Sequence, residues 1–196
     1  MSDPSTDPAV NRTGLANITR TNIYTGAPPL IIAAASPYIR PANTTAYSAN
    51  DAVSNNATAA NVNPITFAAS HILNAPLVIS RIRVLSTDTG PGTASATFEM
   101  WLFNSDPTAN SGVGGGDNAA FSQKQAGFIG IMSGVFASSS DGSIATMIPD
   151  DGAPYIITTP PSGSRTLYGL LKTLTAFTPS ANSTTFNAVL EGIQGQ

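Results

Sequence analysis

The chain has 196 residues, of which 41% are hydrophobic and only 10% charged, and its formal net charge is −3 at pH 7. This length suits one domain with a single sizeable core, whereas the charged fraction is far below the ~25% usual for soluble proteins. The 8 lysines and arginines form no basic stripe, which argues against nucleic acid or a membrane surface as a partner. The absence of cysteine excludes disulfides, thiolate catalysis and cysteine-ligated zinc. A surface of small neutral polar residues instead suits packing against neighbouring protein.

Residues 1–40 are rich in Ser, Thr, Asn and Pro and show little periodicity. Repeated X-Pro pairs disfavour helix here, because the residue before a proline is driven to extended conformations. We interpret the stretch as an extended N-terminal arm, and a disordered tail is the alternative. Leu30, Ile31 and Ile32 form an apolar plug that would need a partner surface, which makes them the candidate contact residues.

Residues 41–196 alternate short apolar and β-branched runs with turn signals, and no long helix is convincing. This pattern predicts one all-β domain, an antiparallel β-sandwich with jelly-roll topology that follows the arm. The predicted strands are residues 77–86, 97–103, 128–136, 143–148, 155–158, 165–177 and 184–193.

The run 77–86, LVISRIRVLS, is the clearest of these strands. Because side chains alternate across a strand, Val78, Ile82 and Val84 are expected on one face. The other face would then carry Arg81 and Arg83.

A glycine run, Gly114–Gly116, lies in the long connection after the predicted strand 97–103 and is followed by Asp117. A phosphate cradle would need Gly-Lys-Ser/Thr leading into a helix, and an aspartate repels phosphate. Asp88, Asp106 and Asp117 could supply oxygen ligands for calcium, although the spacing of an EF-hand is absent. The simplest interpretation is a structural loop in which glycines supply unusual backbone angles.

No catalytic group emerges from the sequence. His71 is the sole histidine and no Gly-x-Ser-x-Gly elbow accompanies it, so a serine-hydrolase triad and a histidine zinc site are both disfavoured. A carboxylate pair for glycoside hydrolysis would have to use Glu99 or Glu191. Glu99 next to Trp101 could form a sugar site, yet a strand glutamate facing solvent is commoner. We therefore expect no enzymatic activity, no catalytic or metal-binding residue and no cofactor.

Several motifs in order resemble virion proteins of tailed phages and prophages, in particular head decoration (cement) proteins with jelly-roll domains. The resemblance covers roughly residues 40–135. The motifs that carry it are TTAYSANDAVSNN (Thr44–Asn56), LVISRIRVLSTD (Leu77–Asp88), FEMWLFNSDPT (Phe98–Thr108), DNAAFS (Asp117–Ser122) and FIGIM (Phe128–Met132).

This resemblance implies a virion structural protein on the capsid exterior, with the major capsid protein and copies of itself as partners, as a homotrimer. It implies no nucleic-acid and no membrane contact. Under it, Leu30, Ile31 and Ile32 anchor the arm on a neighbouring subunit or on the shell. The glycine run becomes a loop between two strands whose DNAAF end packs rather than catalyses. The long N-terminal segment and the expanded glycine run are departures from the family pattern.

The alternative is a carbohydrate-binding module, or a tail or neck component of the virion with the same domain. Sugar recognition would use aromatic rings for stacking. The candidates for that role are Tyr47, Trp101, Tyr155 and Tyr168.

Overall fold

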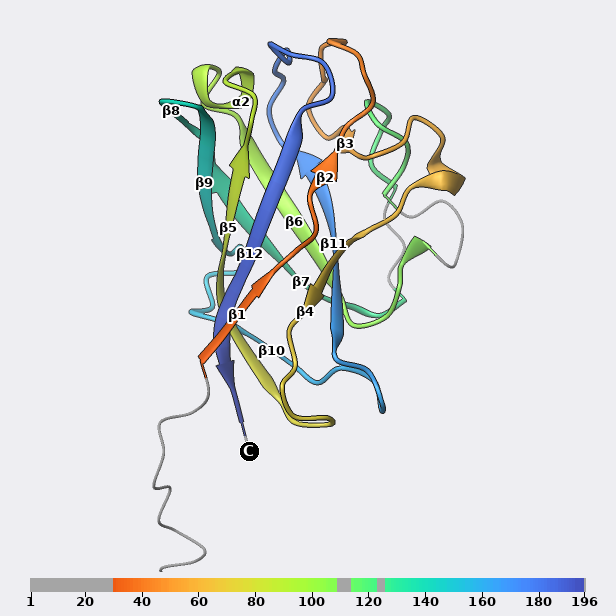
Figure 1. Cartoon of the computed structure of the whole chain (residues 1–196), viewed down its shortest axis with the longest axis vertical. Coiled ribbons are helices and arrows are strands. Elements are labelled where there is room, and N and C mark those ends of the chain that lie inside the picture. The colour runs from red at the N-terminus through yellow and green to blue at the C-terminus, as the bar shows by residue number, and fades with distance from the viewer. Residues whose placement is uncertain (1–29, 109–113, 123–125, 196) are drawn as a thin grey trace, which may run out of the picture.

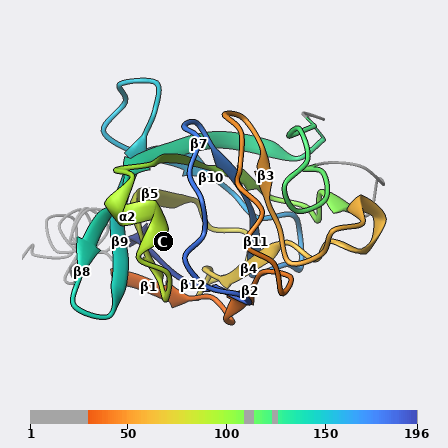
Figure 2. The ribbon, with the colours of Figure 1, turned by 90° about the horizontal axis from the view of Figure 1, so that it is seen from above.

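A computed structural model describes residues 30–108, 114–122 and 126–195 and shows two antiparallel sheets packed face to face (Figures 1 and 2). The all-β antiparallel fold expected from the sequence is confirmed. Residues 1–29 of the predicted arm lie outside the described residues. The rest of that stretch begins with strand β1 (Leu30–Ala34), which pairs antiparallel with the C-terminal strand. The sandwich therefore starts at Leu30 rather than at residue 41.

The first sheet runs from β1 through β12 to β5, and two strands share the far edge of β5. One half of β5 pairs with β9 and the other half with β10. The short β2 and β8 add to β12 and β9. The strands of this sheet after β1 are β2 (Tyr38–Ile39), β5 (Leu77–Ser86), β8 (Ala137–Ser139), β9 (Gly142–Pro149), β10 (Ile156–Thr158) and β12 (Thr185–Gln194).

The second sheet runs from β7 through β6 to β11, whose far edge is shared by β3 and β4. β9 also pairs with β7, through Met132 and Pro149, and so links the two sheets on one side. The nested pairs β5–β12 and β6–β11 are expected of a jelly roll, whereas a strand shared by both sheets, β9, is not. The strands of the second sheet are β3 (Ala52–Val53), β4 (Ile65–Ala68), β6 (Thr97–Phe103), β7 (Phe128–Val135) and β11 (Thr166–Thr173).

Helix is confined to two short turns in the described part of the chain, η2 (Ala59–Asn61) and α2 (Gly90–Thr93). No helix there is long and apolar enough to cross a membrane.

The core fills the space between the sheets with side chains from alternate strand positions. An aromatic cluster lies at its centre, with the ring centroids of Phe98 and Phe136 4.8 Å apart. Every strand predicted from the sequence is present, with ends shifted by a few residues. β6 is buried on both faces, as its apolar sequence indicates.

A bulge in β5 changes the predicted faces of this strand. Ile82 and Val84 point into the core and Arg81 and Arg83 point out, as expected. Val78 was expected on the same face as Ile82 and Val84, but it faces outward. The register shifts opposite Glu191 and Gly192, so the alternation inverts across the bulge. A one-residue shift moves all following side chains to the other face.

The outer face of the second sheet is also covered. Loops lay Val62 and Phe121 over Trp101, whose indole ring centroid lies 5.2 Å from that of Phe121. Phe103 and Leu170 belong to the same small cluster. This second apolar layer explains why β6 needs hydrophobic residues on both sides.

Candidate interaction surface

The glycine run serves a structural purpose through Asp117. The Asp117 carboxylate is buried and accepts hydrogen bonds from Arg40 Nη2 (3.2 Å), the Tyr47 hydroxyl and the Ser54 backbone N–H (3.0 Å). Its lone pairs are thus used within the protein. This arrangement supports the interpretation of the loop as structural.

Burial and the Asp117 carboxylate both raise the pKa of Tyr47 well above its ordinary value. Burial likewise raises the pKa of Tyr38 to about 12. The Arg40 guanidinium lies 4.7 Å from the centroid of the Tyr47 ring, in a cation–π contact. These groups form a polar centre that fixes the chain after β2 against the glycine-rich loop.

The backbone at the glycine run requires glycine. Gly114 and Gly115 have φ of +85° and +90°, a region that side chains disfavour. A Cβ on Gly116 would lie 2.0 Å from the carbonyl oxygen of Ala57. The expectation that these residues supply unusual backbone angles is confirmed for Gly114 and Gly115, whereas Gly116 is required for space.

The other aspartates proposed as metal ligands are also engaged locally. Asp88 accepts hydrogen bonds from the N–H groups of Gly90 and Ser180 and from the Thr184 hydroxyl. Asp106 accepts from the N–H of Thr108. Within the described ranges, no group of three or more His, Asp or Glu side chains is placed to hold a metal ion.

The remaining chemical candidates are dispersed over the fold. His71 is exposed, its N–H donates to Gln194 and its carbonyl oxygen accepts from Arg165. Glu99 does not face solvent: it is buried, and Lys172 Nζ (3.0 Å) and Trp101 Nε1 (2.8 Å) donate to its Oε2. Glu99 is therefore held in a buried ion pair with Lys172 and a hydrogen bond from Trp101, rather than in an open sugar site.

The four stacking candidates differ in exposure. Tyr47 and Trp101 are buried and Tyr168 is partly buried within the cluster under the loops. Tyr155 alone among these four is exposed.

An exposed line of apolar side chains crosses the first sheet. The strand registers place Leu30 opposite Ile193, Ile193 opposite Val78, and Val78 opposite Ile157, so one side chain from each of four adjacent strands lies in line. Leu30 is 65% exposed, Ile157 62% and Ile193 38%, and Val78 is half-buried. We call these four residues the apolar row.

The predicted contact residues divide between the two sides of β1. Leu30 and Ile32 point outward, at 65% and 60% exposure, whereas Ile31 is buried in the core at 1%. Leu30 thus belongs to the apolar row and Ile32 lies next to it. Ile31 instead holds β1 on the sandwich.

An ion-paired cluster borders the apolar row. Arg81 and Arg83 each donate through Nε to one carboxylate oxygen of Glu191. Burial alone would raise the pKa of Glu191, but the hydrogen bonds and positive charges of the two arginines outweigh it and hold that pKa below its usual value. A hollow of about 430 Å³ lies between this cluster, the row and Tyr155.

Sequence reasoning missed Val78, Ile157 and Ile193 as parts of the surface. Each was correctly placed in a strand, and apolar residues at outward positions are the available signal. Their alignment depends on the register of four strands and on the β5 bulge, which no local pattern reveals.

In the comparisons with known proteins, no family model and no curated protein matches the chain. The likeness of its motifs to phage virion proteins therefore stays a prediction.

Proposed function

We propose that this protein is a structural protein of a phage virion that decorates the outside of the capsid shell and cements it. In this role it binds the major capsid protein and associates with copies of itself as a homotrimer. The function is binding rather than catalysis. The observation that carries the proposal is the apolar row, an aligned set of exposed hydrophobic side chains on a sheet face that no other described segment covers. Contiguous apolar surface on a domain marks sites of protein association.

The composition supports this proposal. Only 10% of residues are charged, and the charges that border the row, Arg81, Arg83 and Glu191, are already paired with one another. Repeating a modest contact many times over a symmetric particle yields strong retention through avidity.

The test compares charge substitutions inside and outside the row. Leu30→Asp and Ile193→Asp place a carboxylate in the row, and Val135→Asp is the matched control because Val135 is 56% exposed on β7. Light scattering measures the oligomer, and cosedimentation with shells of the major capsid protein measures occupancy.

We expect trimers and shell binding for the unsubstituted chain and for Val135→Asp, with at least tenfold weaker binding of both row variants. Circular dichroism verifies that each variant folds. Unchanged occupancy in both row variants would contradict the proposal.

A carbohydrate-binding role is the second candidate, because the Tyr155 ring is 45% exposed at the end of the hollow. Glycan-array binding that disappears in Tyr155→Ala would favour it. Cosedimentation with purified tails instead of shells would favour a tail or neck component.

A further inference from the structure

The charged side chains of the first sheet are confined to one place. In its strands, the charged residues are Arg81, Arg83 and Glu191 alone. Two cations that share one carboxylate leave this cluster with one positive charge, although the chain as a whole has a formal net charge of −3. The two arginine side chains are 54% and 45% exposed, whereas that of Glu191 is 10% exposed. The positive charge therefore faces outward.

Apolar side chains border this cluster on three sides. The apolar row lies on the first side. On the opposite side, Leu85 follows Arg83 by two residues along β5 and lies in register with Ile144 of β9, and both are exposed. On the third side, Ile32 of β1 lies in register with Glu191 and is exposed as well. The outer face of the first sheet is thus an apolar surface with a single positive centre.

The two arginines have donors left for a second anion. Both use Nε to donate to Glu191, so among the described residues the Nη groups at the ends of the two guanidiniums are left for another acceptor. The planar end of a guanidinium binds a carboxylate through two parallel N–H groups. Because Glu191 already holds both arginines in place, less side-chain entropy is lost when a further carboxylate binds to them.

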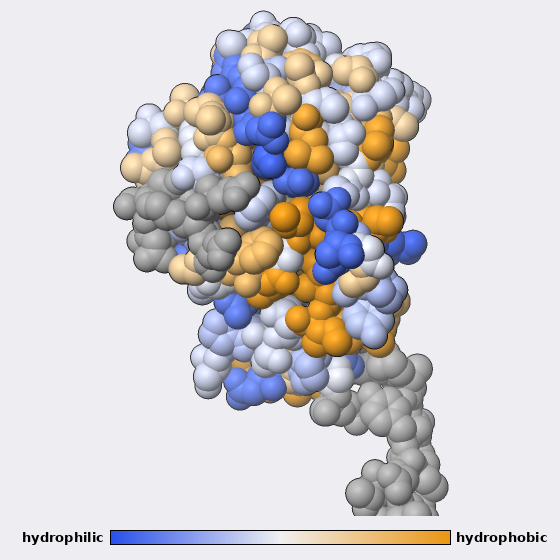
Figure 3. Space-filling model, turned by 180° about the vertical axis from the view of Figure 1, so that it is seen from behind, coloured by the Kyte–Doolittle hydropathy of each residue, from blue (hydrophilic) through white to orange (hydrophobic). Residues whose placement is uncertain are grey.

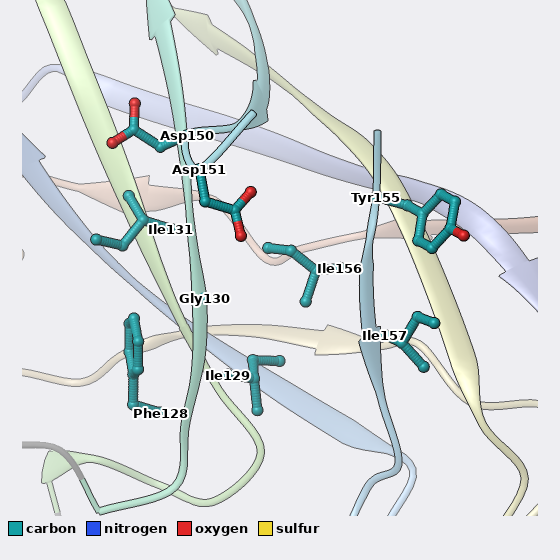
Figure 4. Close-up of a pocket in the computed structure, with 9 residues that line it drawn as sticks. All are labelled: Phe128, Ile129, Gly130, Ile131, Asp150, Asp151, Tyr155, Ile156 and Ile157. Atoms are coloured by element: carbon teal, nitrogen blue, oxygen red, sulfur yellow. The ribbon is translucent and has the colours of Figure 1, made fainter. Parts of the chain in front are cut away.

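The hollow beside the cluster can take the apolar part of a ligand. It has a volume of about 430 Å³, and the residues that line it include Leu30, Ile193, Tyr155 and Arg81. Figure 4 shows Tyr155 and Ile157 on the same side of β10, so the tyrosine ring lies on the side that carries the apolar row. A ligand with an apolar group in this hollow would have a neighbouring carboxylate next to Arg81.

The sign of the charge distinguishes this face from other apolar surface on the molecule. Hydrophobic side chains also gather on the lower half of the molecule when it is seen from behind (Figure 3). A second hollow, of about 440 Å³, is lined by residues of β7 and β10 and by Asp150 and Asp151, whose carboxylates would repel an anion (Figure 4). Of these two hollows, the one lined by Arg81 therefore suits an acidic partner.

We propose that the outer face of the first sheet recognises a carboxylate flanked by apolar side chains on the major capsid protein, and that Arg81 and Arg83 bind this carboxylate. The inference rests on the proposed function and names the chemistry of its partner. The apolar row supplies contact area, and the arginines supply selectivity. An apolar surface without the carboxylate would cover the two guanidiniums without offering them a counter-charge, which costs free energy.

Cosedimentation with shells of the major capsid protein at low and high NaCl concentration tests the proposal. We expect the unsubstituted chain to bind about fivefold more weakly at high salt, because salt screens ion pairs at a protein surface. Arg83→Gln should bind about tenfold more weakly at low salt and lose most of the salt dependence, and Arg83→Lys, which keeps the charge without the planar fork, should lie between them. Arg165→Gln is the matched control, at an exposed arginine outside the first sheet. Full binding by Arg83→Gln at both salt concentrations would overturn this inference and leave the proposed function standing.

A small carboxylate tests the same site without shells. In an NMR titration of the full chain, phenylbutyrate should shift the backbone amides of β5 and β12, and the neutral phenylbutyramide should bind at least about fivefold more weakly. Arg83→Gln should remove this difference between the two compounds, and Arg165→Gln should preserve it. Equal affinity for both compounds in the unsubstituted chain, or shifts confined to other strands, would overturn the proposal. Selective binding of phenylbutyrate by a chain that fails to bind shells would support the carboxylate site and contradict the capsid role.

Discussion

Arg40 and Asp117, 77 residues apart in the chain, form a buried ion pair in which Arg40 Nη2 lies 3.2 Å from Asp117 Oδ2. The pair connects the segment after β2 to the glycine-rich loop. The loop is thereby anchored at its centre by a charge contact as well as at its ends by strands.

Removing one charge of this pair should be costly. In Asp117→Asn the buried Arg40 keeps its charge without a counter-ion, so we expect a loss of about 3–5 kcal/mol in the free energy of unfolding. Urea denaturation measures it. Asp106→Asn, in the same connection, changes a side chain that accepts hydrogen bonds only from the N–H and hydroxyl of Thr108, and because the amide oxygen can still accept them it should cost at most about 1 kcal/mol. Equal losses in the two variants would show that the pair contributes little.

Space at the glycine run should limit substitution at Gly116. In Gly116→Ala the new Cβ would meet the Ala57 carbonyl oxygen at 2.0 Å, and the backbone would have to move. We expect a loss of about 3 kcal/mol from overpacking. Gly152→Ala is the control, since φ is +78° there but no atom lies within 4 Å, and about 1 kcal/mol is expected from backbone conformation alone. Thermal unfolding ranks the two, and a milder effect at Gly116 would contradict the close contact.

The Glu191 cluster should make stability sensitive to acid. Because the pKa of Glu191 is lower in the folded protein, its contribution is present above the pKa of the unfolded chain, about 4.3, and is lost as pH falls through the folded value. Arg81 and Arg83 are 54% and 45% exposed, so the contribution is screened and should be about 1 kcal/mol. Glu191→Gln should be less stable than the unsubstituted chain at pH 7, and the difference should shrink as the pH falls below the pKa of an unfolded glutamate. Curves that stay parallel from pH 7 to 3 would rule out this linkage.

The two buried tyrosines should make the fold sensitive to base. A raised pKa in the folded state means that Tyr38 and Tyr47 stabilise the fold below about pH 10 and oppose it as pH rises further, when the unfolded chain ionises first. Absorbance at the tyrosinate band should show both groups titrating only with unfolding, detected in parallel by circular dichroism. Tyr47→Phe should reduce the part of the tyrosinate absorbance change that accompanies unfolding. If every tyrosine ionised while the circular dichroism of the folded protein persisted, the prediction that Tyr38 and Tyr47 ionise only on unfolding would be wrong.

Local pattern sufficed to predict the all-β class and seven of the strands, whereas β1, β2, β3, β4 and β8 were not predicted. Alternation placed Ile82 and Val84 correctly because one local rule controls them, and it failed at Val78 because the bulge depends on the partner strand. The Arg40–Asp117 pair and the apolar row lay beyond prediction, since both depend on contacts between distant segments. The unusual backbone angles of Gly114 and Gly115 were correctly predicted, because they have a local sequence signal, whereas the need for glycine at position 116 comes from its contact with Ala57.

The covering of one sheet and not the other has a consequence for orientation. Val62 and Phe121 lie over the outer side of β6, whereas no described residue covers the apolar row on the outer side of β1, β5 and β12. The two flat sides of the domain are therefore not interchangeable. When the domain packs against a flat partner, its two outer sheet faces would bury different amounts of apolar surface. That difference alone can select one orientation of the domain, without a separate orienting element.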